Sequence, residues 1–273
     1  MKTNTVTTYS SSNDPLKTSL VKVWEHKNLI WLFAKRDIQV KYAQTYLGFA
    51  WSVFKPLLGL SIYAFFGYLL KWSSGDIPYA AYVLTGLVGW NLFSYIVING
   101  VSSVHESTDL IKKIYFPKSI LPLAKSLVGL FEALISLILV IPLLVYYEIG
   151  ISMKIIFIPI ILLFNISCGL GAVFFVAAIS IIKRDLLQVL PYLINLTIWL
   201  TPVFLLPSTF PEKFQFIFKY NPLANIIDSW RWVIFDGFEF QNIWVLNFAL
   251  SILLLIVGFH FYSRRESKFA DSI

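Results

Sequence analysis

The sequence predicts an all-α protein that crosses a membrane several times, and two observations carry this prediction. Of the 273 residues, 58% are hydrophobic and only 14% are charged, which leaves more apolar surface than a soluble domain of this size can bury. The apolar residues occur in long runs, and the basic residues border these runs. The net charge of +7 therefore indicates membrane topology, and binding to nucleic acid is not expected.

The N-terminal region is expected to lead from water to the membrane surface. Residues 1–20 are polar and rich in Ser and Thr, which predicts a flexible cytoplasmic tail without the apolar core of a signal peptide. Residues 21–46 are expected to form an amphipathic helix in the membrane interface, with Asp37 on its polar side. A soluble helix packed on a partner would give the same pattern. The apolar stripe at helical spacing consists of Trp31, Ala34, Ile38, Tyr42 and Thr45.

Six segments are long and apolar enough to cross a hydrocarbon layer of about 30 Å. Lys and Arg are concentrated before the first segment, in the second and fourth connections, and after the last segment. The positive-inside rule therefore places both termini in the cytoplasm, including the C-terminal residues 263–273. The six predicted spans lie near residues 48–70, 80–101, 119–147, 153–181, 186–206 and 243–262.

The cytoplasmic connection after the second span is expected to contain a short helix over residues 107–115. Ser107 or Thr108 is suited to its N-cap, and Pro117 follows its end. Leu110, Ile111 and Ile114 give it an apolar edge that a solvated loop does not need. The edge fits either a helix resting on lipid or a helix that docks on another protein.

The external connection before the last span is expected to form a helical hairpin over residues 209–236. Pro211 and Pro222 are suited to helix starts, and Gly237 to the end of the second helix. Neither helix is long enough to cross a membrane. The hairpin is therefore expected to dip into the outer leaflet, with its aromatic residues at headgroup level: Phe210, Phe214, Phe216, Phe218, Trp230 and Trp232.

No motif of a nucleotide-binding, zinc-protease, hydrolase or dinucleotide site is present. Neither enzymatic activity nor a metal or cofactor is therefore expected in this chain. Within the predicted spans the ionisable residues are Lys55, Lys125 and Glu132. Lys125 and Glu132 share one helix face and are expected to form a buried pair with each other, or else to contact a substrate. So few carboxylates argue against an ion-coupled carrier.

A stripe of aromatic and amide side chains runs along the fifth span. Gln188, Tyr192, Asn195 and Trp199 recur at helical spacing, and lipid disfavours Gln and Asn, so this face is expected to contact protein or water. The first and second spans carry similar stripes of small residues with Tyr63, Trp90 and Phe93. Small residues usually indicate close helix packing. The alternative is a conduit for sugars, which stack on aromatic rings and exchange hydrogen bonds with amides.

Several motifs resemble one known family. They are RDIQVKYAQTYLGFAWSVFKPL (residues 36–57), KIYFPKSILPLA (113–124), KRDLLQVLPY (183–192), NPLANIIDSWRW (221–232) and the ending RRESKFADSI. Their order and sequence are similar to the permease subunit of ABC-2 type polysaccharide exporters, closest to the O-antigen (lipopolysaccharide) export permeases. Capsule and teichoic acid permeases are more distant. The resemblance covers residue 29 to the end.

The resemblance implies a half-transporter in the bacterial inner membrane. Two copies would form the membrane part, and two separate ABC ATPase subunits, which bind ATP and Mg, would dock beneath them. The cargo would be a glycan on undecaprenyl diphosphate, and the hairpin 209–236 would lie at the outer mouth. The resemblance assigns ATPase docking to Trp31, Ile38, Tyr42, Asp109, Leu110, Ile111, Lys112, Lys113 and Ile114. It assigns the channel lining to Tyr63, Trp90, Phe93, Gln188, Tyr192, Asn195 and Trp199.

Two positions depart from the family pattern. Gln39 stands where a basic residue is more common, and Lys55 where an amide is common. Lys41 and Lys55 are the candidates for holding the lipid diphosphate, because both charges are expected near the cytoplasmic headgroups. The alternatives are an ABC-2 exporter of teichoic acid, capsule, drugs or small lipids and, in a different class, a stand-alone ion-coupled carrier or channel. The identity of the sugar does not follow from the sequence.

Overall fold

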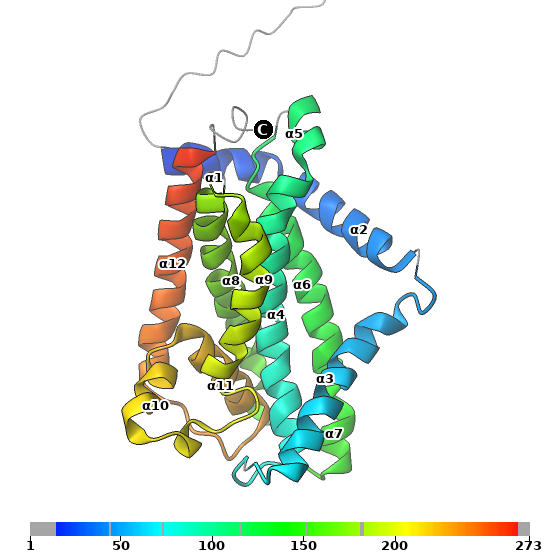
Figure 1. Ribbon diagram of the computed structural model, residues 1–273, viewed down its shortest axis with the longest axis vertical. Coiled ribbons are helices and arrows are strands. Elements are labelled where there is room, and N and C mark those ends of the chain that lie inside the picture. The colour runs from blue at the N-terminus through cyan, green and yellow to red at the C-terminus, as the bar shows by residue number, and fades with distance from the viewer. Residues whose placement is uncertain are drawn as a thin grey trace, which may run out of the picture.

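Helices account for most of the computed structural model, which describes residues 15–43, 45–72, 74–114, 116–150, 152–180 and 183–266 (Figure 1). Long helices pack side by side as a bundle, and shorter helices lie at its two ends. The described residues also include three short 3-10 helices: Met153–Phe157, Ile198–Leu200 and Pro207–Thr209. The α-helices are α1 Pro15–Glu25, α2 Lys27–Ala43, α3 Ala50–Leu69, α4 Tyr79–Glu106, α5 Thr108–Lys113, α6 Ile120–Ile138, α7 Val140–Tyr146, α8 Ile158–Ser180, α9 Asp185–Thr197, α10 Glu212–Lys219, α11 Pro222–Ile234 and α12 Ile243–Arg265.

Five segments of the described chain are helical, long and apolar enough to cross a membrane. They are α3, α4, α6 with α7, α8 with the 3-10 helix before it, and α12, and each coincides with a predicted span. The predicted span 186–206 differs, because α9 and Ile198–Leu200 end after 16 residues (residues 185–200), a length of about 24 Å. Thr201 is extended at φ −132° and ψ 149°, as expected for a residue before proline. Pro202 therefore ends the helix.

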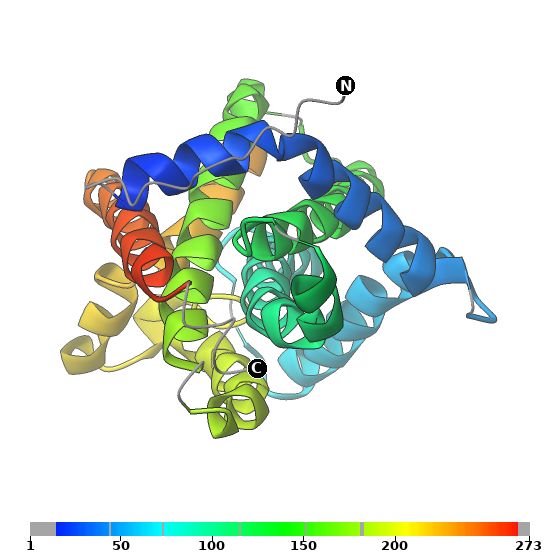
Figure 2. The same ribbon diagram turned by 90° about the horizontal axis from the view of Figure 1, so that it is seen from above.

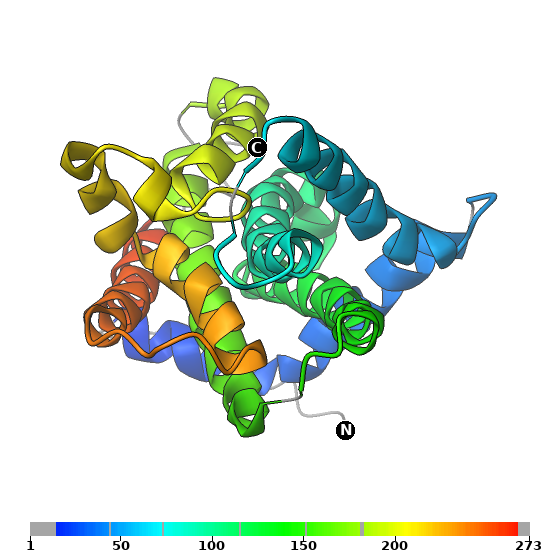
Figure 3. The same ribbon diagram turned by 90° about the horizontal axis from the view of Figure 1, so that it is seen from below.

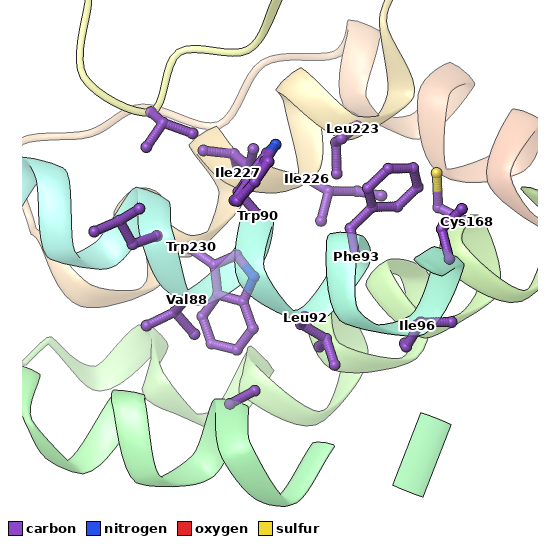
Figure 4. Packing of buried hydrophobic residues seen from close by; sticks show 14 of the residues in the cluster. Val88, Trp90, Leu92, Phe93, Ile96, Cys168, Leu223, Ile226, Ile227 and Trp230 are labelled. Atoms are coloured by element: carbon purple, nitrogen blue, oxygen red, sulfur yellow. The ribbon is translucent and has the colours of Figure 1, made fainter. Parts of the chain in front are cut away.

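Helix α4 forms the centre of the bundle and is buried along most of its length. It contacts α3, α6, α8, α9 and α11, and Figure 4 shows Val88, Trp90, Phe93 and Ile96 packed among residues of these neighbours. Small residues permit the close contacts: a Cβ on Gly89 would lie 2.7 Å from the Trp230 ring. The packing interpretation of the small-residue stripe on the second span is therefore confirmed.

The two ends of the bundle carry different short helices (Figure 1). The end with α1, α5 and the end of α12 is called the α5 end, and the opposite end, with α10 and α11, the α10 end. Helix α1 lies across the α5 end (Figure 2). It begins at Pro15, so the expectation of a flexible tail through residue 20 is wrong for its last six residues. Proline is favoured in the first turn of a helix, and α1 packs on α12. Residues 1–14 lie outside the described part.

The expected hairpin forms two helices whose starts were predicted correctly. Pro211 precedes α10, and Pro222 begins α11 after Asn221, whose side chain accepts a hydrogen bond from the backbone N–H of Leu223. The expectation that Trp230 lies at headgroup level is wrong, because its side chain is fully buried against α4. Helix α11 packs against α4, α8 and α12, so its inner face belongs to the core.

Candidate functional site

Helix α2 packs on α6 through a small apolar contact. Ala34 of α2 and Ala124 and Val128 of α6 are buried together, with Ile38 partly buried beside them. Trp31 was expected on the same stripe, but it is 65% exposed. The side of α2 that faces the bundle is therefore rotated relative to the expected stripe, and Trp31 points away from it.

Two ion pairs flank this contact. The Lys125 ammonium lies 2.8 Å from the Asp37 carboxylate, and the Lys41 ammonium donates to the Glu132 carboxylate, which also accepts a hydrogen bond from the Tyr42 hydroxyl at 3.0 Å. The expectation that Lys125 and Glu132 pair with each other is wrong. So is the placement of Asp37 on the solvated side. Each charge on α6 finds an opposite charge on α2, which a pattern within one helix does not reveal.

The electrostatics of the α2 side chains follow from these partners. Burial raises the pKa of Asp37, but hydrogen bonds from Lys125 and Arg36 outweigh burial and hold the pKa below its ordinary value. Desolvation lowers the pKa of the Lys41 ammonium against the opposing effect of Glu132. The carboxylate of Glu132 is thus the partner of the Lys41 ammonium.

Helix α5 rests on the same part of the bundle. Leu110 and Ile111 are partly buried against an apolar cluster that joins α5 to α2 and the start of α6, whereas Ile114 is 56% exposed and Lys113 is exposed. Lys113, at the end of α5, and Ile114, the residue after it, are therefore accessible from outside. The side chains of Asp109 and Lys112 lie outside the described residues. The other members of the cluster are Leu29, Ile30, Phe33, Phe116, Ile120 and Leu121.

A cavity of about 370 Å³ lies between α2, α4, α5 and α6. Arg36, Asp37, Glu106 and Lys125 contribute charged groups to its lining, and Leu110 also lines it. The two helices for which docking was expected thus enclose a shared polar hollow at the α5 end.

Lys55 lines a second cavity, of about 250 Å³, between α3, α4 and α6. Asn91, Asn99, Tyr95 and Glu132 also line it. Among the described residues, the exposed Lys55 ammonium has no hydrogen-bond or ion-pair partner. Of the two lysines proposed to hold a diphosphate, Lys55 is thus the one whose charge is not already matched.

The polar face of α9 and of the 3-10 helix that follows it is open on the side of the bundle. Gln188 and Asn195 are exposed, Tyr192 is 74% exposed and Trp199 is 53% exposed. Figure 3 shows α9 and α3 at one edge of the bundle, on either side of α4. This places amide and aromatic groups where another molecule can contact them.

Two further residues expected on the channel lining lie inside the bundle. Trp90 and Phe93 are buried in the core cluster that α4 forms with α8 and α11 (Figure 4). The indole N–H of Trp90 has no hydrogen-bond partner among the described residues. In this conformation they support the fold and do not form part of an open face.

Tyr63 and Trp199 were both expected on the channel lining, on different spans. Both contact the ring of Phe204. The Phe204 ring stacks on Tyr63 at a centroid distance of 4.8 Å and on Trp72 at 5.6 Å, and it meets Trp199 edge-on at 4.6 Å. Phe204 itself is buried. It was missed in the sequence because it was counted as part of a continuous span.

Arg231 holds the non-helical segment 201–206 and is fully buried. Its guanidinium donates to the backbone carbonyls of Tyr82, Pro202 and Val203 and forms an ion pair with Asp228 at 2.7 Å. The sequence indicated only a basic residue in an external loop. The sequence signal for such a donor is the pair Thr201–Pro202, far earlier in the chain. This pair ends a helix and leaves backbone carbonyls that need hydrogen-bond donors.

Two tyrosines of α4 complete this arrangement. The Tyr82 hydroxyl lies within hydrogen-bond distance of the carbonyls of Pro202 (3.2 Å) and Leu205 (3.4 Å), and the Tyr79 hydroxyl donates to that of Phe204 (3.1 Å). Irregular backbone at membrane depth is tolerated only where protein or water satisfies it. Side chains of α4 and α11 provide the hydrogen-bond donors for the backbone carbonyls of residues 202–205.

Among the described residues, no three His, Cys, Asp or Glu side chains come together in a way that could hold a metal ion. The charged groups are instead arranged in pairs between helices, and the exposed polar groups form a face on α9.

Known proteins with similar sequences are transport proteins. The chain is 30% identical over 247 residues to an O-antigen export system permease protein RfbA of Klebsiella pneumoniae, covering 89% of this chain and 94% of the relative. It is 24% identical over 257 residues to RfbA of Myxococcus xanthus (92% and 98%). It is 24% identical over 247 residues to the polysialic acid transport protein KpsM of Escherichia coli (87% and 93%). Residues 28–235 match the family described as ABC-2 type transporter, and the chain therefore belongs to the ABC-2 type transporter family.

Proposed function

We propose that this multi-pass membrane protein is the permease subunit of an ATP-driven exporter that moves a lipid-linked polysaccharide of the O-antigen type across the bacterial inner membrane. The names of the relatives in Klebsiella and Myxococcus support the substrate class. The observation that carries the proposal in this chain is the exposed amide and aromatic face of α9. A protein that only packed in lipid would bury or lack Gln188 and Asn195.

The transport path is formed when a second copy of the chain faces α9. In the homodimer, Gln188, Tyr192, Asn195 and Trp199 line the path, and Tyr63 joins them through its stack on Phe204. Trp90 and Phe93 contribute by packing in the conformation described here. Sugar rings would stack on Tyr192 and Trp199 while their hydroxyls exchange hydrogen bonds with the amides.

The energy for transport comes from two ABC ATPase subunits that dock at the α5 end. This end therefore faces the cytoplasm, together with both termini. Helix α9 with the segment after it completes the sixth crossing, and the α10 end, with its re-entrant hairpin, faces outward as the outer mouth. Trp31, Lys113 and Ile114 are exposed for docking. Leu110 and Ile111 act by holding α5 on α2. Ile38 and Tyr42 act by holding α2 on α6. Asp109 and Lys112 complete the proposed docking set.

The lipid diphosphate is held near Lys55. The ammonium of Lys55 has no partner among the described residues and borders a cavity with amide side chains, both of which suit a phosphate. Lys41 is the second candidate, but in this conformation its ammonium is bound to Glu132. It would reach a phosphate only by exchanging that partner.

Complementation tests the proposal. In the source bacterium with this gene deleted, surface glycan should disappear and its lipid-linked precursor should accumulate on the cytoplasmic side, and the wild-type chain should restore export. The Tyr192→Ala and Trp199→Ala double variant should reduce surface display of long chains. Leu193→Ala, at an exposed apolar position of the same helix, is the matched control. Export by the double variant equal to that of the control would contradict the proposed path.

The similarity to the polysialic acid transport protein KpsM favours one second candidate, export of a polysaccharide other than O-antigen, and we take capsule polysaccharide as the case to test. The same deletion strain separates the two, because the polymer that accumulates inside identifies the cargo. A strain that accumulates capsule polymer and retains normal lipopolysaccharide would replace the O-antigen assignment.

A further inference from the structure

The charges that join α2 to α6 follow a complementary order. Along α2 an acid, Asp37, precedes a base, Lys41, and along α6 a base, Lys125, precedes an acid, Glu132. Both helices run in the same sense through the contact, because the earlier residue of α2 pairs with the earlier residue of α6. A slip of α2 by one turn would bring like charges toward each other. The order therefore fixes the register of α2 on α6.

The surroundings of the pairs resist separation of the two helices. All four charged side chains are partly buried, so solvent screens them less than surface pairs. Ala34 packs on α6 in the same contact. To lift or slide α2, the protein must break both pairs and expose this contact.

The contact continues from α6 to the centre of the bundle. Gly129, between the two charged residues of α6, lies so close to α4 that a Cβ would be 3.0 Å from the Tyr95 ring. The Lys41 ammonium lies over the same ring, 4.5 Å from its centroid. A displacement of α2 that carries α6 with it therefore reaches α4 directly.

We propose that α2 and α6 move as one body during transport, and that the Asp37–Lys125 and Lys41–Glu132 pairs are the positioning groups that pass movement of the ATPase to the membrane helices. The proposal rests on the proposed function in one respect, the docking of the ATPase on α2 and α5. What it adds is the route of the movement, which passes from α2 to α6 and then to α4. Apolar contact alone would hold α2 in place without fixing its register.

Charge exchange tests the pairs. Asp37→Lys and Lys125→Asp alone should leave ATPase co-purification and ATP hydrolysis within about twofold of wild type while lowering export about tenfold or more, and the double exchange should recover most of the loss. Lys125→Arg, which keeps the charge, should export like wild type. Singles that export normally, a double exchange no better than its singles, or singles that fail to accumulate in the membrane would each overturn the proposal.

A cross-link distinguishes movement of α2 and α6 as one body from movement of α2 relative to α6. Cysteines at Ala34 and Ala124, in a chain with Cys168 replaced by Ala, are joined by a short thiol reagent, and joining is verified by mass spectrometry. If α2 and α6 move together, the joined protein should export at the rate of the unjoined protein. Loss of export on joining would overturn the proposal. The proposed function fails separately, if the wild-type chain does not co-purify with an ATPase.

Discussion

Replacement of Arg231 by Met should destabilise the protein strongly. The substitution keeps much of the side-chain volume but removes the donors to the carbonyls of Tyr82, Pro202 and Val203 and the partner of Asp228. Removal of one member of a buried ion pair costs about 3–5 kcal/mol. Because Asp228 is 19% exposed, we expect about 3 kcal/mol, which is a large share of the roughly 5–15 kcal/mol that keeps a domain folded.

The assay is thermal unfolding of the purified protein in detergent, followed by tryptophan fluorescence. Lys213→Met, on the exposed side of α10, is the matched control and should unfold like wild type. Adding Asp228→Asn to Arg231→Met should recover part of the loss, because the unpaired carboxylate is then absent. If Arg231→Met unfolds at the control temperature, the buried guanidinium does not hold the segment 201–206.

Three further predictions follow from the contacts. Gly67→Ala should destabilise the protein by about 1–3 kcal/mol, because its Cβ would lie 2.2 Å from the Tyr79 ring; unchanged thermal unfolding would contradict the close contact of α3 and α4. Ile114→Asp should abolish co-purification of the ATPase without changing thermal unfolding, whereas retained co-purification would remove Ile114 from the docking surface. The pKa of Asp37 is lowered in the folded protein, so the stability lost in Asp37→Asn should be constant above about pH 5 and vanish as the pH falls below about 4; a difference independent of pH would show that the Lys125 pair contributes nothing.

The sequence was sufficient for elements whose signals are local. Long apolar runs located five membrane helices, and Pro211 and Pro222 marked the starts of α10 and α11. The end of α9 was placed too late, because hydropathy does not register that Thr201 and Pro202 leave the helical conformation. The apolar residues that follow continue the run without continuing the helix.

The candidate site was predictable only in part, because partners lie on other helices. That Gln188, Tyr192 and Asn195 share one face of α9 followed from helical spacing, but the exposure of that face did not. The pairing of Lys125 with Asp37 could not be predicted from the sequence. Lys125 and Glu132 lie on one face of α6, and only the placement of α2 beside α6 shows that each pairs with a residue of α2. Arg231 was hidden for the opposite reason: its carbonyl partners come from a segment that was expected to satisfy itself as a helix.

The shallow attachment of α3 has a consequence for handling the protein. Near its start, this helix packs on its neighbours through Phe49, which contacts Tyr42 and Phe131. In its second half, Tyr63 stacks on Phe204. Most of its apolar surface is exposed. In a bilayer, acyl chains or a neighbouring protein must cover that surface. Backbone amides of α3 should therefore exchange with deuterium faster than those of α4, and the choice of detergent or lipid should change the exchange in α3 first.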